Sequence, residues 1–178
     1  MSNLYSVWVS LYRLMFRIFS LCLIVSANTV AETQFKQIKA QNWELGTPDN
    51  IAIDYYQASD ERLSVLLFWA TWCPNCRDLM PHIQGLASEF QSKGVDFYAL
   101  NIFEDADPVA YFKKHNYSFT LLLIADLVAE DYNVAGVPAL FVVDKDKTII
   151  YQRNLGKSDE DSAADIRELL YRKLDGRG

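Results

Sequence analysis

The sequence has few of the residues that build metal centres and disulfide frameworks. Its 178 residues include three cysteines, two histidines, seven glycines and five prolines. Three cysteines cannot form the several bridges that hold small secreted scaffolds together. A structural zinc site takes four ligands, so it would need nearly every cysteine and histidine in the chain. Since 51% of the residues are hydrophobic, we expect a fold held by an apolar core, with no bound metal and no cofactor.

Basic charge is also scarce. The chain has 17 lysines and arginines against 23 acidic residues, which gives a formal net charge of −6. Proteins that bind nucleic acid usually carry a basic patch or stripe, so this balance argues against nucleic acid as a partner. The mixed charge and high apolar content argue against global disorder. The length is typical of one domain with a short extension.

The first 31 residues contain no acidic residue. Arg13 and Arg17 precede an apolar stretch at 18–27, and small residues follow at Ala27 and Ala31. This order is typical of a secretory signal peptide. The apolar core of about ten residues is shorter than the span of about 20 that crosses a bilayer.

We therefore predict a cleaved signal peptide over residues 1–31 and a single domain over residues 32–178, exported to the periplasm or beyond. The alternative is an uncleaved N-terminal membrane anchor, since residues 4–16 are also rather apolar.

Strand-like and helix-like segments alternate along the remaining chain. Apolar or alternating runs predict strands, and capping residues with apolar periodicity predict helices. The alternation predicts an α/β fold with a mixed central sheet flanked by helices. The expected strands are 51–56, 65–69, 95–100, 119–124, 137–144 and 148–152, and the expected helices are 73–93, 105–115, 126–132 and 158 onward.

Two cysteines stand where the strand 65–69 gives way to a helix. Cys73 and Cys76 are separated by two residues, and Pro74 is suited to the first helical position. The thiolate is the reactive form of cysteine, and the N-terminus of a helix stabilises an anion. We predict that Cys73 is the attacking nucleophile and that Cys76 resolves the mixed disulfide. The alternatives are half of a metal site, with His82 and His115 as further ligands, or an inert structural disulfide.

A second feature is Gly136-Val137-Pro138, directly before an apolar strand. A proline at this position is compatible with a cis peptide bond, although an ordinary trans proline is the alternative. A cis bond would expose the backbone N–H and C=O of Val137, to which an extended substrate segment pairs by strand addition. Trp72 is expected to shape the substrate-facing surface, and Trp69 is expected to pack in the core.

These motifs resemble those of exported thioredoxin-like proteins of the TlpA/ResA type. The resemblance covers roughly residues 60–175 and rests on three segments: 68–77 with Met80-Pro81, 132–138 and 140–144. It implies a thioredoxin fold, a catalytic pair at Cys73 and Cys76, a cis-proline at Pro138, and residues 105–124 as an inserted helix and strand. Substrate contacts are then expected from Trp72, Pro74, Val137 and Pro138.

The sequence departs from this family where relatives carry acids near the cysteines. Leu67 stands where thioredoxin has a buried aspartate, and Leu79 stands where TlpA/ResA-type proteins commonly have a glutamate. These carboxylates are proposed to move a proton at the resolving cysteine. Asp78 lies beside the second position but points about 100° away on a helix. The sequence therefore names no base for Cys76.

We interpret the chain as an exported thiol:disulfide oxidoreductase that reduces disulfides in protein substrates through Cys73 and Cys76. The resemblance implies a membrane-bound electron donor as a second partner. The alternatives are a disulfide oxidase or isomerase, and a non-enzymatic redox-sensing or metal-delivering binding module.

Overall fold

The structure is a computed structural model that describes residues 38–176. The signal peptide predicted at residues 1–31 lies outside the described residues. Between residues 38 and 176, no helix is both long enough and apolar enough to cross a membrane.

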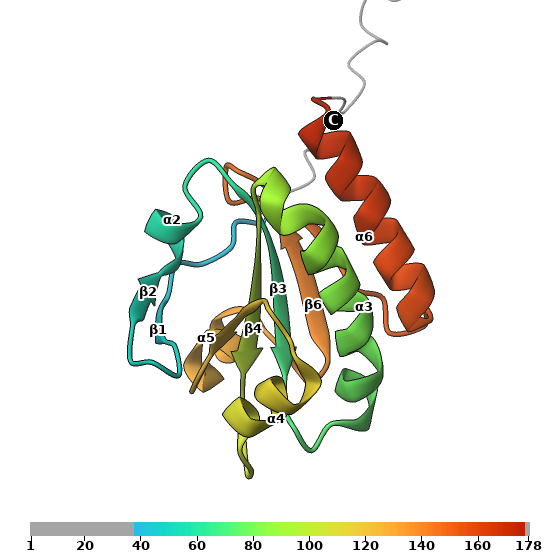
Figure 1. The fold of residues 1–178 in the computed structure, drawn as a ribbon. Coiled ribbons are helices and arrows are strands. Elements are labelled where there is room, and N and C mark those ends of the chain that lie inside the picture. The colour runs from blue at the N-terminus through green and yellow to red at the C-terminus, as the bar shows by residue number, and fades with distance from the viewer. Residues whose placement is uncertain (1–37, 177–178) are drawn as a thin grey trace, which may run out of the picture. The chain divides into compact units, whose positions relative to one another are not determined.

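A five-stranded mixed sheet forms the centre of the fold, as the sequence predicts. Its order is β5-β4-β3-β6-β7, with β3, β4 and β5 parallel to one another and β6 antiparallel to both β3 and β7 (Figure 1). Every residue of the central strand β3 is buried, because helices and loops cover both faces of the sheet. The bounds are β3 Leu63–Trp69, β4 Val95–Asn101, β5 Thr120–Leu122, β6 Ala139–Val143 and β7 Ile149–Gln152.

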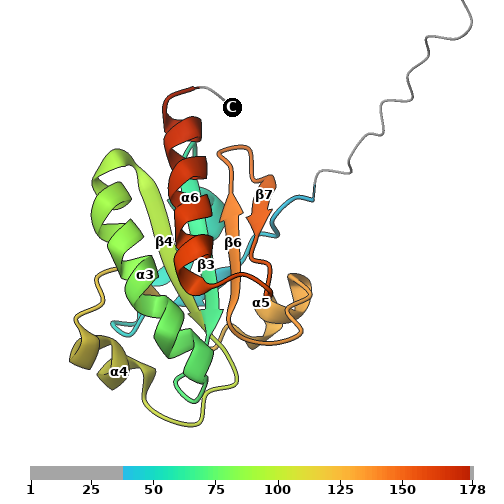
Figure 2. The same cartoon turned by 90° about the vertical axis from the view of Figure 1, so that its right-hand side faces the viewer.

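Helices divide between the two faces of this sheet. The long helices α3, Pro74–Phe90, and α6, Asp159–Leu174, lie side by side on one face, and α5, Asp126–Asp131, lies on the other (Figure 2). Alternate residues of β3 point into two separate apolar clusters. Leu67 joins the cluster under α3 and α6, and Phe68 joins the cluster on the α5 side.

The N-terminal part of the described chain is more ordered than the sequence predicts. A separate two-stranded sheet, β1 Glu44–Gly46 with β2 Ala52–Asp54, leads into the short helix α2, Tyr55–Ala58. The predicted strand 51–56 is therefore wrong in its last two residues. The carboxylate of Asp54 accepts a hydrogen bond from Gln57 N–H and so starts a helix. Tyr55 is fully buried, and its hydroxyl lies 2.6 Å from Ser64 Oγ.

The helix after the cysteine motif begins as predicted. Cys73 is the N-cap of α3 and Pro74 is its first residue. The helix passes through Pro81, and a 3₁₀ turn at Gln91–Lys93 ends it before Gly94, whose φ of +87° favours glycine. The predicted insertion at 105–124 is also present as α4, Pro108–His115, followed by the edge strand β5. Asp107 caps α4 by accepting from Ala110 N–H.

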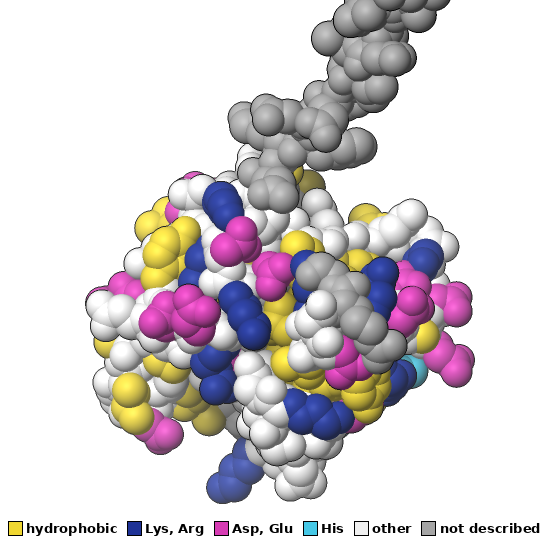
Figure 3. Space-filling view, turned by 90° about the horizontal axis from the view of Figure 1, so that it is seen from above, with side chains coloured by type: hydrophobic (Ala, Val, Ile, Leu, Met, Phe, Trp, Pro, Cys, Tyr) yellow, Lys and Arg dark blue, Asp and Glu magenta, His cyan; other side chains and the backbone are white. Residues whose placement is uncertain are grey.

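Charged side chains of both signs surround apolar ones on the surface at one end of the molecule (Figure 3). Figure 3 views the molecule from above Figure 1, where the arrows of β3 and β4 point to the opposite, lower end. Neither sign forms a patch of its own in this view.

The start of α6 provides a test of helix capping in this fold. Ser158 Oγ accepts a hydrogen bond from Asp161 N–H at 3.0 Å. We expect Ser158→Ala to lower the free energy of unfolding by about 1 kcal/mol, because a helix-end donor loses its partner. Urea unfolding measures the change, and Ser158→Thr, which keeps the hydroxyl, is the matched control. Equal losses in both variants would contradict the capping role.

Candidate functional site

Cys73 and Cys76 face each other at the start of α3 and are joined by a disulfide, with their Cα atoms 5.3 Å apart. Both are buried, at 3% exposure for Cys73 and 0% for Cys76. Cys73 is thus slightly more exposed than Cys76.

Hydrogen bonds fix the position of the first cysteine. Cys73 Sγ accepts from the backbone N–H of Cys76 at 3.1 Å, and Cys73 N–H donates to Ala70 C=O at 3.2 Å. In the reduced form, the same place at the helix N-terminus offers a thiolate an N–H donor and the positive end of the helix dipole.

The second predicted feature lies next to the pair. The Val137–Pro138 peptide bond is cis. The N–H and C=O of Val137 make no backbone hydrogen bond to another described residue. A hollow of about 370 Å³ is lined by Val137 and Pro138 together with Asn75, from inside the cysteine motif. The structure thus brings Asn75 of the cysteine motif and the Val137–Pro138 segment, which are far apart in sequence, to one surface.

The other two predicted contact residues flank the cysteines in sequence. Pro74 is exposed at the first position of α3. Trp72 is half exposed, and its Nε1–H donates to Phe103 C=O at 2.7 Å. Trp69 is fully buried against Tyr111 and Phe112, which confirms its place in the core.

The sequence reasoning missed Glu104, which anchors the loop before the cysteines. Its carboxylate accepts hydrogen bonds from both the N–H and the hydroxyl of Thr71, and from Asn101 Nδ2 at 2.6 Å. It also accepts from the N–H groups of Asp105 and Ala106, each at 3.1 Å. Burial acts to raise the pKa of Glu104, but these hydrogen bonds outweigh it and hold the pKa below its usual value of 4.5. Glu104 is therefore a charged anchor at neutral pH.

One signal in the sequence was available for this residue. Glu104 follows β4, which pairs in parallel with β3. The carboxyl ends of parallel strands meet at one edge of the sheet, so a polar residue just after β4 is expected near the cysteines that follow β3.

The positions where relatives carry acids are apolar and enclosed. Leu67 and Leu79 are both fully buried in the cluster that contains Cys76, whereas Asp78 is exposed on α3. His82 is half-buried, and His115 stacks on Tyr117. Within residues 38–176, no three histidine, cysteine or acidic side chains are grouped to hold a metal ion.

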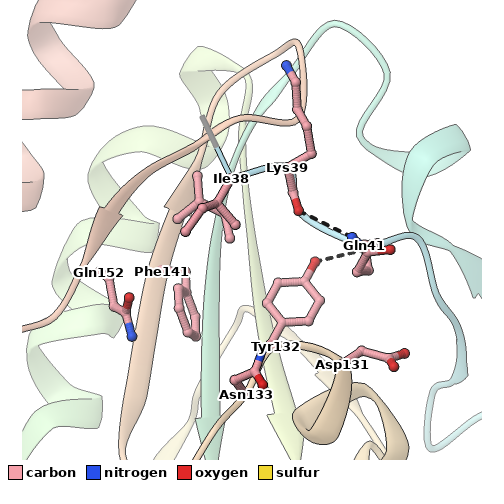
Figure 4. A pocket seen from close by; sticks show the side chains of 9 residues that line it. Ile38, Lys39, Gln41, Asp131, Tyr132, Asn133, Phe141 and Gln152 are labelled. Atoms are coloured by element: carbon pink, nitrogen blue, oxygen red, sulfur yellow. Dashed lines mark hydrogen bonds between the residues drawn. The ribbon is translucent and has the colours of Figure 1, made fainter. Parts of the chain in front are cut away.

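A second hollow of about 300 Å³ lies on the α5 side of the sheet and contains none of the predicted site residues. Figure 4 shows Tyr132 and Phe141 in its wall, with the Tyr132 hydroxyl donating to Gln41 C=O at 2.9 Å. This bond ties the segment around Gln41 to the end of α5.

The fold and the cysteine pair define a thioredoxin-like protein of the thiol–disulfide oxidoreductase class. The AhpC/TSA family matches residues 32–152, and the chain belongs to this family.

Similar proteins agree with this class. A thiol-disulfide oxidoreductase ResA from Bacillus thuringiensis subsp. konkukian is 27% identical over 150 residues, which cover 79% of this chain and 87% of that protein. ResA from Bacillus subtilis is 30% identical over 87 residues, covering 48% of this chain and 49% of the relative. The crystal structure of a putative thiol:disulfide interchange protein DsbE from Chlorobium tepidum superposes with a TM-score of 0.64 at 20% identity, covering 78% and 96% of the two chains. The last comparison shows the shared fold.

Proposed function

We propose that this protein reduces disulfides in exported polypeptides through a Cys73/Cys76 dithiol–disulfide couple. The observation that carries the proposal is the position of Cys73 Sγ at the N-terminus of α3, where it accepts the N–H of Cys76. Cys73 and Cys76 are the proposed catalytic residues. Trp72, Pro74, Val137 and Pro138 are the proposed substrate contacts.

The proposed reaction has two displacement steps. The Cys73 thiolate attacks one sulfur of the substrate disulfide, forms a mixed disulfide and releases the other sulfur as a thiolate. Cys76 then loses its proton, attacks Cys73 Sγ and releases the second substrate thiolate. Two electrons pass to the substrate, and the protein is left with the Cys73–Cys76 disulfide. A dithiol donor must then reduce this disulfide, and the family resemblance supports a membrane-bound donor.

Export is part of the same proposal. The order of basic, apolar and small residues in 1–31 supports a signal peptide, cleaved or retained as an anchor. N-terminal sequencing of the protein recovered from the cell envelope tests it: a start near residue 28 or 32 supports cleavage, and a start at residue 1 supports an anchor. Recovery in the cytoplasmic fraction alone would contradict export.

The reduction potential of the Cys73–Cys76 couple tests the direction of electron flow. The couple of a reductase is expected to have a reduction potential near the thioredoxin value of about −270 mV. The couple of an oxidant has a reduction potential of about −120 mV. Titration of the purified domain against glutathione buffers, read by thiol alkylation and mass shift, gives the value. A value near −120 mV would instead support the oxidase alternative. Metal retained at one equivalent by the reduced pair would support the binding module.

A further inference from the structure

Four bulky apolar side chains are exposed at the edge of the sheet that holds the cysteine pair. Trp72 is 47% exposed, Phe103 58%, Ile124 82% and Leu127 75%. We call these four residues the apolar face. Phe103 lies in the loop after β4, Ile124 lies in the loop after β5, and Leu127 lies in the first turn of α5. The fourth, Trp72, directly precedes Cys73.

Hydrogen bonds join these loops into one surface. Trp72 Nε1–H donates to Phe103 C=O at 2.7 Å, and Phe103 N–H donates to Asp126 Oδ1 at 2.8 Å. Ala125 N–H, between Ile124 and Asp126, donates to Asn101 C=O at 2.9 Å. In Figure 1 the end of β4 and the start of α5 lie at the same lower end of the molecule as the start of α3. Trp72 and Phe103 therefore connect the segment before Cys73 to the loop after β4, at the end of the molecule where α5 begins.

Two residues of the apolar face have a backbone conformation that their side chains disfavour. Phe103 has φ of +47° and Ile124 has φ of +56°. This left-handed region is uncommon for bulky residues and a genuine outlier for β-branched ones. Burial of the side chain would offset the cost of this backbone conformation, but both side chains are exposed to solvent. Strained residues of this kind cluster at binding and catalytic sites.

Acidic side chains are concentrated around Phe103. Glu104, Asp105, Asp107 and Asp126 surround Phe103 in sequence or through hydrogen bonds, and none of them takes part in an ion pair with a described residue. The opposite end of the molecule, by contrast, carries both signs side by side (Figure 3). A partner that covers the apolar face is therefore expected to bring positive charge.

We propose that the apolar face binds the part of the substrate polypeptide next to the disulfide that Cys73 attacks, and that it selects segments with bulky apolar and basic side chains. This inference rests on the proposed function, because a substrate in a mixed disulfide with Cys73 must lie against the neighbouring Trp72. Phe103 is then a residue that determines specificity, supplied by the loop that leads into the inserted helix α4.

Kinetics with two matched peptide disulfides test the inference. One peptide carries leucine and lysine beside its cysteines, and the other carries serine and glutamate. For the unchanged protein we expect kcat/KM to favour the leucine–lysine peptide by about tenfold or more. In Phe103→Ser this ratio is expected to fall towards one. Ile38→Ser, which alters an equally exposed residue (64%) that is not part of the apolar face, is expected to keep the full ratio.

The outcomes separate the inference from the function on which it rests. An equal preference for both peptides in the unchanged protein, or an unaltered ratio in Phe103→Ser, would overturn the inference while leaving the exchange activity established. A loss of rate in Phe103→Ser that is the same for both peptides would also overturn it, because that result indicates a misplaced loop. Failure of the unchanged protein to reduce even glutathione disulfide would refute the proposed function, and the inference with it.

Discussion

Serine in place of Cys73 is expected to reduce disulfide exchange to the uncatalysed rate. A serine hydroxyl does not ionise near neutral pH and forms no disulfide, so the first displacement step is lost altogether. The change removes one sulfur atom from a buried position and leaves α3 with an N-cap residue that helices favour. A fluorogenic peptide disulfide measures the rate, and circular dichroism checks that the fold is kept.

Serine in place of Cys76 is the matched variant and has a different expected result. Cys73 still attacks, but the mixed disulfide has no resolving thiol and accumulates. Non-reducing electrophoresis of cell-envelope extracts, followed by mass spectrometry, identifies the trapped partners and the cysteine that holds them. Adducts on Cys76 in the Cys73→Ser protein, with exchange at the normal rate, would reverse the assignment of nucleophile and resolving thiol.

The parts of the fold that depend on local sequence were predictable. The cysteine pair, Pro74 at the first helical position and the apolar run before them lie within a dozen residues, and each has a direct physical effect on the backbone. The strand order was predictable only as a mixed sheet, because alternation of strands and helices restricts topology without naming neighbours. The structure supplies the order β5-β4-β3-β6-β7.

The segment before β3 was misjudged because two interactions there are not local. Ile51 to Tyr56 alternates weakly, which suggested one strand. Tyr55 instead stacks on Trp43 with ring centroids 4.8 Å apart and reaches Ser64 in β3. Burial of two large aromatic rings outweighs a weak alternation pattern.

The anchor of the active-site loop was missed for a related reason. Glu104 lies 33 residues after Thr71, and only the parallel pairing of β3 with β4 brings them together. An acidic residue in a loop usually indicates a solvated charge. Its role becomes evident from the five donors that surround one carboxylate, and those donors are visible only in the folded chain.

Alanine in place of Glu104 is expected to lower the free energy of unfolding by about 2 to 4 kcal/mol. Hydrogen bonds to charged groups contribute about 1.5 to 3 kcal/mol each, and removal of the acceptor leaves the buried Asn101 Nδ2 with only its longer hydrogen bond of 3.5 Å to Trp69 C=O. Exchange activity should fall as well, since the loop that holds Trp72 and Cys73 loses its tie to the end of β4. Urea unfolding of the oxidised protein gives the first quantity, and Asp105→Ala is the control for loss of an exposed acid in the same loop.

The pH dependence of this loss distinguishes a charged anchor from a side chain that merely fills space. The folded-state pKa of Glu104 lies below its ordinary value of 4.5, so its contribution is fully present above that value and disappears as the pH falls through the lower folded pKa. Glu104→Gln keeps the size and one acceptor oxygen but places an amide among N–H donors. The stability gap between the unchanged protein and Glu104→Gln should therefore be widest at neutral pH and should narrow below about pH 4.5. A gap that stays constant down to pH 3 would mean that the carboxylate charge does not hold the loop, and that Glu104 supports the cysteines through packing alone.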